Sequence, residues 1–359
     1  MLHSFPATLM RGGTSKGLFI RAADLPSQPD ERDMVLLSAM GSPDLRQIDG
    51  IGGAHPLTSK VAILAPPSHP DADIDYLFLQ VSVDKAEVSS AQNCGNMLAG
   101  VGPWAIENGF VDALPSQTCV RIHMLNSGGL AIANVPTRDG QVMYEGDTAI
   151  SGVPRTAAAI PIEFLDIAGS STGALLPTGN KIDHSQGIDV TCIDNGMPVI
   201  LMRAADLGKT GSETPSELES DEGLKALIEA IRLEMAPKMG LGDVRQKTVP
   251  KLTLLSPAIN GGIAMTRTFI PHRVHQAIGV LGAVSVATGC LIPGTVAAGI
   301  SSARSTTGDQ GRFSVEHPTG TFEVELEIQG DKIKRSALVR TARKLMSGDV
   351  FVSGSIGES

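Results

Sequence analysis

Short apolar runs separated by turn residues fill the first part of the chain. Runs of roughly four to eight apolar or alternating residues, bounded by Gly, Pro, Asn or Asp, are typical of β-strands. They predict strands at Thr8–Met10, Leu18–Ile20, Lys60–Leu64, Tyr76–Val83, Val120–Met124 and Gly129–Val135. Two stretches are helical in pattern: Asp33–Met40, and Gly95–Asn108, which is small and apolar on nearly all sides.

The second half of the chain repeats this scheme. Strands are predicted at Ile188–Ile193, Pro198–Met202, Leu252–Ser256, Gly262–Thr268, Phe313–Glu316 and Phe322–Ile328. An apolar helix is predicted near His272–Thr288, and an amphipathic surface helix at Glu222–Ala236. Each half surrounds one Gly/Ala-rich helix with short strands, so we predict an α/β (α+β) fold of two pseudo-symmetric domains, although no residue-level repeat is visible.

The chain length and one polar segment set the domain boundary. A chain of 359 residues is long for one core and predicts two domains of roughly 150–200 residues each. The polar run Thr178–Gln186 precedes a fresh strand. We therefore expect an N-terminal domain at 1–184 and a C-terminal domain at 185–344, with the strand at 345–359 a candidate for returning to the first domain. We expect the active site in the cleft between them.

Composition excludes several classes of partner. The formal net charge of −9 and the 3% aromatic content are unlike the basic, stacking surfaces of nucleic-acid binders. No Cys-x-x-Cys pair is present, which argues against a disulfide framework or a zinc ribbon and favours a reducing, cytoplasmic location. The uncharged run Val274–Ala303 is rich in small residues and is interrupted by Pro293, which favours a buried helix over a membrane span.

The segment Ser90–Asn96 places the thiol of Cys94 at the predicted start of a buried helix. Free amide N–H groups at a helix N-terminus bind carboxylates and stabilise a thiolate, and Gly95 permits close approach of a ligand. The alternative interpretation is that Cys94 is simply a small buried residue. The residues alone leave both open.

A lysine enters an apolar strand at Lys60, and His55 precedes it in the same run. A lysine that loses hydration in such a strand favours its neutral amine, which can act as a base. The alternative is a strand-end lysine with its ammonium in water, and His55 is equally ambiguous.

The turn Arg11–Gly17 carries two cations, two hydroxyls and several glycine N–H groups. Its residue order does not match a Walker motif, so nucleotide binding is not predicted. It suits a carboxylate-binding turn or, equally, a glycine-rich hairpin. Asn195, His272 and Arg304 are weaker candidates for ligand binding. The sequence contains no Ser-His-Asp elbow, HExxH, Rossmann GxGxxG or clustered metal ligands.

Five segments together resemble the PrpF family. They are LMRGGTSKG at 9–17, GGAHPLTSKVAIL at 52–64, SAQNCGNMLAGVGPWAIENG at 90–109, IDNGMP at 193–198 and VEHPTG at 315–320. The resemblance covers essentially the whole chain. It implies a diaminopimelate-epimerase-like fold of two pseudo-symmetric domains, with neither a metal nor an organic cofactor.

The resemblance also implies an activity and its residues. It places the catalytic pair at Lys60 and Cys94 and implies a 1,3-allylic proton shift on a small unsaturated di- or tricarboxylate. Diaminopimelate epimerase takes a cysteine from each half, whereas the second apolar helix here is expected to begin at Pro271-His272-Arg273, which disfavours a two-thiol mechanism. The substrate ligands are expected at Arg11, Thr14, Ser15, Lys16, Asn93, Gly95, Asn96, Asn195, His272 and Arg304.

The compact length resembles the oxalomesaconate branch of the family more than the longer methylaconitate branch, and the motifs are similar to those of the 4-oxalomesaconate isomerase in the protocatechuate 4,5-cleavage pathway of lignin breakdown. We therefore expect an allylic isomerase of 4-oxalomesaconate, with a homodimer as the candidate assembly. A keto–enol tautomerase of gallate breakdown, a 2-methylaconitate cis-trans isomerase, a lyase or hydratase, and a non-catalytic organic-acid binding protein are the alternatives.

Overall fold

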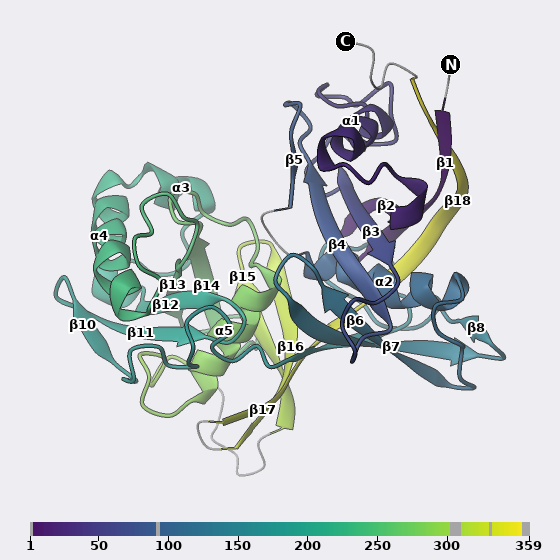
Figure 1. Cartoon of the computed structure of the whole chain (residues 1–359). Coiled ribbons are helices and arrows are strands. Elements are labelled where there is room, and N and C mark those ends of the chain that lie inside the picture. The colour runs from purple at the N-terminus through teal and green to yellow at the C-terminus, as the bar shows by residue number, and fades with distance from the viewer. Residues whose placement is uncertain (1–2, 91–93, 302–309, 330–331, 354–359) are drawn as a thin grey trace. The chain divides into compact units, whose positions relative to one another are not determined.

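The computed structural model describes residues 3–90, 94–301, 310–329 and 332–353. The chain divides into two compact units, one formed by Met1–Leu165 with Val339–Ser359 and the other by Asp166–Leu338. We call them unit 1 and unit 2, and Figure 1 labels their elements. Among the described residues, no helix combines the length and the apolar character needed to span a membrane.

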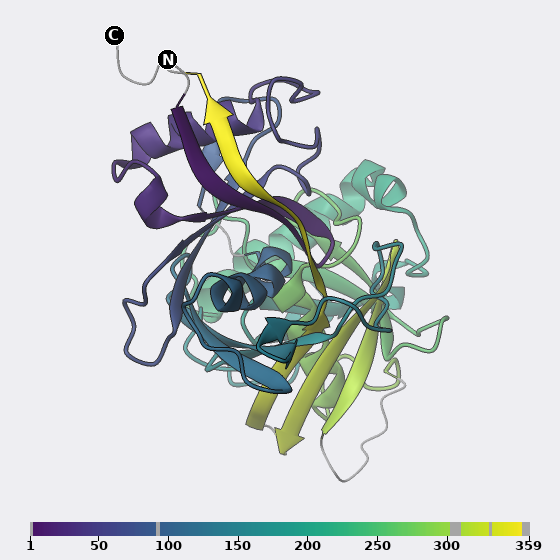
Figure 2. The same cartoon turned by 90° about the vertical axis from the view of Figure 1, so that its right-hand side faces the viewer.

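Unit 1 is built on one mixed sheet. Its strands are β1 (His3–Gly12), β2 (Ser15–Arg21), β3 (Lys60–Ala65), β4 (Ile74–Val81), β5 (Val88–Ser89), β6 (Gln117–Met124), β7 (Gly129–Arg138), β8 (Gln141–Val142), β9 (Ile160–Leu165) and β18 (Ala342–Val352). Its helices are η1 (Ala22–Asp24), α1 (Pro29–Met40) and α2 (Gly95–Glu107). Neighbouring strands follow the order β18-β1-β2-β3-β4-β6-β7-β9, with the β2–β3 and β4–β6 pairs parallel and the others antiparallel. Figure 2 shows β1 and β18 running side by side.

Helices cover both faces of the first strands of this sheet. Leu18 and Val61 belong to the core that packs against α1. Side chains alternate between the faces of a strand, so Gly17 and Lys60, next to them in sequence, lie on the other face. That face meets α2, because a Cβ added at Gly17 would contact Met97 Cε at 2.9 Å. Lys60 therefore lies on the α2 side of the sheet.

Unit 2 repeats this topology in the same chain order. Its strands are β10 (Asp183–Ser185), β11 (Ile188–Asp194), β12 (Pro198–Arg203), β13 (Lys251–Ser256), β14 (Ala264–Phe269), β15 (Gln310–His317), β16 (Gly320–Gln329) and β17 (Lys332–Arg340). Its helices are η2 (Ala205–Leu207), α3 (Pro215–Ser220), α4 (Glu222–Lys238) and α5 (Val280–Leu291). From β11 to β17 each strand pairs with the next in sequence, and the β12–β13 and β14–β15 pairs are parallel. The parallel pairs fall at the positions of β2–β3 and β4–β6 in unit 1, which confirms the predicted mixed α/β fold of two similar halves.

The predicted start of the second apolar helix was wrong. Helix α5 begins at Val280 with Gly279 at its N-cap, not near His272. The intervening segment turns back on the sheet: Val274 forms a bridge with Phe269, and the Val274 N–H donates to Glu219 Oε1 at 2.8 Å. These contacts satisfy backbone groups outside a helix, so the uncharged run begins in a turn and becomes helical only at Val280.

Candidate active site

Lys60 opens β3 and is almost fully buried, with 6% of its surface exposed. Its Nζ donates a hydrogen bond of 2.6 Å to Gln80 Oε1 on the neighbouring strand β4. The same nitrogen lies 4.9 Å from the centroid of the Phe78 ring. Both partners of the lysine nitrogen are neutral groups on β4.

Cys94 is the N-cap residue of α2, in an extended conformation. It is half-buried, and its side chain forms no capping bond with the described residues of this helix start. Its carbonyl oxygen accepts from Leu98 N at 3.0 Å, the first bond of the helix, and from the Tyr76 hydroxyl at 3.2 Å. Burial, followed by the charge of Cys94, raises the pKa of Tyr76 well above its usual value, so the phenol remains a donor.

One face of β4 connects the two predicted catalytic residues. Tyr76, Phe78 and Gln80 alternate along this strand and therefore point to the same side. The first contacts the backbone of Cys94, and the other two contact the amine of Lys60. The predicted pair thus shares a single supporting strand within unit 1.

The glycine turn between β1 and β2 packs directly on the start of α2. A Cβ at Gly12 would overlap the backbone oxygen of Asn96, and a Cβ at Gly13 would overlap its side chain, so only glycine fits. Asn96 Nδ2 in turn donates to Thr14 Oγ1 at 3.0 Å. Ser15 is 1% exposed, and within the described part of the chain its hydroxyl has no hydrogen-bond partner.

Arg11 and Lys16 lie on the face of the sheet opposite to Lys60. They pair across β1 and β2, and Lys16 precedes Gly17, the parallel partner of Lys60. Arg11 Nη1 donates to Gly13 O at 2.8 Å and to the carbonyl and hydroxyl oxygens of Thr341, both at 3.0 Å. The structure brings Thr14, Ser15 and the start of α2 to the Lys60 face, but not these two cations.

The candidates in unit 2 occupy different environments. Asn195 is fully buried, and its Nδ2 donates to Thr288 Oγ1 at 2.9 Å and to Ser336 Oγ at 3.1 Å. His272 is exposed in the turn before α5. Asn93 and Arg304 lie outside the described residues.

The topological repeat identifies counterparts in unit 2 of the two predicted catalytic residues, which the sequence pattern alone did not reveal. Lys251 opens β13 as Lys60 opens β3, and Gly279 caps α5 as Cys94 caps α2. Burial, and then Arg232, lowers the pKa of Lys251 to about 8. In the sequence, a lysine opens the strand that follows α1 in unit 1 and the strand that follows α4 in unit 2. Only the strand pairing shows that these two lysines occupy equivalent positions.

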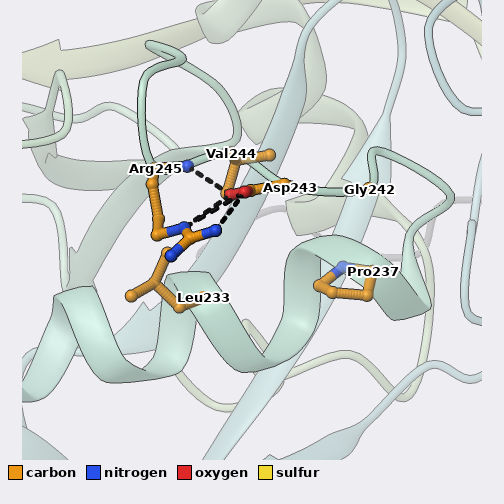
Figure 3. Close-up of a pocket in the computed structure, with 6 residues that line it drawn as sticks. All are labelled: Leu233, Pro237, Gly242, Asp243, Val244 and Arg245. Atoms are coloured by element: carbon orange, nitrogen blue, oxygen red, sulfur yellow. Dashed lines mark hydrogen bonds and ion pairs between the residues drawn. The ribbon is translucent and has the colours of Figure 1, made fainter.

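A surface pocket beside α4 contains none of the predicted site residues. It is lined by Leu233, Pro237, Gly242, Asp243, Val244 and Arg245 (Figure 3). Its two charged groups pair with each other at 2.6 Å, so it offers no uncompensated charge to a substrate. Among the described residues, no group of three or more His, Cys, Asp or Glu side chains is arranged to hold a metal ion.

Known proteins resemble this chain over nearly its full length. A 4-oxalomesaconate tautomerase from Pseudomonas putida is 58% identical over 97% of the chain and 96% of its own length. A (4E)-oxalomesaconate Delta-isomerase from Novosphingobium sp. is 56% identical, and 98% of each chain is covered. The crystal structure of a methylitaconate-delta-isomerase matches with a TM-score of 0.88 at 37% identity, covering 100% of this chain and 98% of that one.

The fold and these relatives define the chain as an isomerase. It belongs to the PrpF protein family, which matches residues 2–353. The resemblance identified from the five sequence segments is therefore confirmed.

Proposed function

We propose that the chain catalyses a 1,3-allylic proton shift on a small unsaturated polycarboxylate, with 4-oxalomesaconate as the preferred substrate. A base removes a proton from a carbon next to an electron-withdrawing group, which gives a dienolate. A proton is then delivered to the other end of the allylic system, so substrate and product have the same mass. Two proton carriers at fixed positions are sufficient for this reaction.

Lys60 is the proposed base and Cys94 the proposed acid. The observation that carries this assignment is that one face of β4 supports both residues, through Gln80 and Phe78 at the amine and Tyr76 at the Cys94 carbonyl. Lys60 is almost fully buried and its Nζ contacts Gln80 and Phe78, which gives its amine a defined position for taking a proton from carbon. The start of α2 offers free N–H groups and a partial positive field beside the thiol.

The start of α2 and the glycine turn are the proposed binding surface for one substrate carboxylate. Gly95 and Asn96 lie in the first turn of α2, and Asn96 contacts Thr14. The buried Ser15 hydroxyl is available as a further hydrogen-bonding group. We assign Arg11 to holding the turn rather than to contacting substrate, because its Nη1 bonds the turn and Thr341.

The remaining predicted ligands have supporting or untested roles. Asn195 is proposed to fix α5 to its sheet, because its amide nitrogen bonds Thr288 and Ser336. His272 is exposed and remains a proposed ligand, together with Asn93 and Arg304. Lys16 is proposed to contribute only to the local positive potential.

The preferred substrate follows from the relatives and from the chemistry. The two relatives described above, at 58% and 56% identity, are named for reactions of oxalomesaconate. A keto–enol tautomerase needs one carbon-centred proton transfer, whereas an allylic isomerase needs two, which suits a paired base and acid. We therefore favour isomerisation, as in lignin breakdown, and keep tautomerisation as the second candidate because the Pseudomonas relative carries that name.

The proposal requires no redox or organic cofactor, since both steps are proton transfers between carbon and side chains. All four cysteines are free, which supports the predicted cytoplasmic location.

Substrate choice and residue roles can be tested together. Purified protein is offered 4-oxalomesaconate and 2-methylaconitate separately, and products are followed by proton NMR and mass spectrometry. We expect faster conversion of 4-oxalomesaconate with no change of mass, complete loss of turnover in Lys60→Ala, and severe loss in Cys94→Ser with folding intact. Near-normal rates in either variant would overturn the residue assignment, a mass change would indicate a lyase or hydratase, and a preference for 2-methylaconitate would change the substrate.

A further inference from the structure

The side-chain amide of Gln80 is held in one orientation by hydrogen bonds to backbone carbonyl groups. Its Nε2 donates to the carbonyl oxygens of Ser59 at 2.9 Å, Pro56 at 3.1 Å and Val81 at 3.3 Å. An amide nitrogen facing three carbonyl groups cannot be exchanged with the amide oxygen, so Oε1 must point the other way. That oxygen is the atom that accepts from Lys60 Nζ.

Two groups on β4 contact Lys60 Nζ. The Gln80 oxygen accepts from it at 2.6 Å, and the face of Phe78 lies 4.9 Å away. The peptide of Phe78 is itself fixed, because the Asn126 side chain accepts from Phe78 N at 2.8 Å and donates to Phe78 O at 2.9 Å. The same Asn126 amide donates to Ser90 O at 2.9 Å, in the segment that leads to Cys94.

The chemical nature of Gln80, as the partner of Lys60, matters as much as its position. A carboxylate at this place would form a buried ion pair and would stabilise the ammonium form of Lys60. A neutral amide oxygen orients the same nitrogen but gives much less preference to its charged form. Within the described residues, the contacts found for Lys60 Nζ are this amide oxygen and the Phe78 ring.

We propose that Gln80 is a positioning residue for the isomerisation: it aims Lys60 Nζ through a neutral amide oxygen rather than a carboxylate. This inference rests on the proposed role of Lys60 as the base. Gln80 contacts the base and not the reacting carbon, so its effect is expected on kcat and on the pH profile.

The near-isosteric variant Gln80→Glu tests this role. We expect the acidic limb of the pH profile of kcat/KM to move up by about one to three pH units, because a carboxylate next to an amine favours its protonated form by that order. At a pH below the limb each unit lowers the reactive fraction about tenfold, and activity should recover as the pH is raised. Gln80→Met, which keeps the length but removes the acceptor, should lower kcat with a smaller change in KM and no upward shift.

Gln47→Glu is the matched control. Gln47 also supports the residue before Lys60, since its Nε2 donates to Ser59 Oγ at 2.7 Å, and its Oε1 accepts from Ala54 N at 2.9 Å. No bond to Lys60 is among its contacts within the described residues. Gln47→Glu disturbs the segment before Lys60 but leaves Gln80, the partner of Lys60, unchanged. The acidic limb of the pH profile of kcat/KM should therefore stay in place. An equal shift in Gln47→Glu and Gln80→Glu would show a general loop effect and overturn the proposal.

An NMR titration separates this inference from the proposed function. Protein labelled at lysine Cε is titrated, and the Lys60 signal is assigned by its loss in Lys60→Ala. A higher titration midpoint in Gln80→Glu, and not in Gln47→Glu, supports the proposal even for a protein without turnover. An unchanged midpoint in folded Gln80→Glu, or full kcat in Gln80→Met, overturns it. Activity that survives in Lys60→Ala would instead overturn the proposed function.

Discussion

The Tyr76 hydroxyl donates a 3.2 Å hydrogen bond to the carbonyl oxygen of Cys94. That oxygen also accepts the first helical bond of α2, from Leu98 N. Tyr76 is fully buried, so the bond fixes the N-terminal start of α2 to strand β4, in the middle of the sheet of unit 1. The same strand places Gln80 against Lys60, which links the positions of the two predicted catalytic residues.

Tyr76→Phe is expected to loosen the start of α2 without creating a large cavity. Loss of one buried hydrogen bond should lower the unfolding free energy by about 1 kcal/mol. We expect kcat to fall by a larger factor than KM rises, because Tyr76 contacts the backbone of Cys94, the proposed proton carrier, whereas the proposed carboxylate site keeps the Asn96 contact to Thr14. Urea denaturation and steady-state kinetics measure both effects. Wild-type kcat in a variant with the expected stability loss would show that this bond does not position Cys94.

Gly12→Ala should damage the site by overpacking. The added methyl group would overlap the backbone oxygen of Asn96 and lie 3.1 Å from Met97 Cα, so the start of α2 must move. Such overpacking costs roughly 1–3 kcal/mol, and turnover should fall sharply. Gly348→Ala in β18 is the control, because a Cβ there has no neighbour within 4 Å. Equal losses in both variants would contradict the close packing of the glycine turn on α2.

Arg11→Ala should affect stability more than substrate binding. The variant loses the Nη1 bonds to Gly13 and Thr341, which should cost roughly 1–3 kcal/mol. Arg343→Ala is the matched control, since Arg343 is exposed directly opposite Arg11 and its removal relieves a like-charge pair. A large rise in KM at unchanged stability would instead make Arg11 a substrate ligand, as the sequence analysis expected.

Lys251→Met should stabilise the protein most near neutral pH. Burial, and then Arg232, lowers the pKa of Lys251 to about 8, whereas an unfolded lysine has a pKa near 10.4. Between these values the unfolded chain binds a proton that the folded chain has lost, so wild-type stability rises with pH in this window. The stability difference between Lys251→Met and wild type should therefore shrink from pH 7 to about pH 10. A difference that does not vary with pH would contradict the lowered pKa of Lys251, and Lys247→Met, at an exposed lysine, is the control.

Apolar and alternating runs predicted most of the strands of unit 1. Lys60–Leu64 and Val120–Met124 were found because their apolar runs are bounded by turn residues. Ile160–Leu165 was missed, since Pro161 and Glu163 interrupt its apolar pattern. Lys332–Arg340 was missed because charged residues fill its first half.

Contacts that depend on strand register could not be predicted from local sequence. Lys60 and Gln80 face each other only because β3 and β4 pair antiparallel in one register. The face of the sheet on which Arg11 lies could not be predicted either. Strand β1 buries residues on both of its faces, so its apolar and polar residues do not alternate cleanly. The thiol at the start of a helix was predictable, since a polar turn followed by a glycine and an apolar run marks such a start.

The most direct test of the Lys60/Cys94 mechanism is the fate of deuterium during turnover of 4-oxalomesaconate in deuterated water, followed by proton NMR. We predict that wild-type protein places deuterium on the carbon at the far end of the allylic system as product forms, and that Lys60→Ala places none there. Deuterium found only at the enolisable ketone carbon, or wild-type incorporation in Lys60→Ala, would contradict a carbon-to-carbon proton shift carried by this pair.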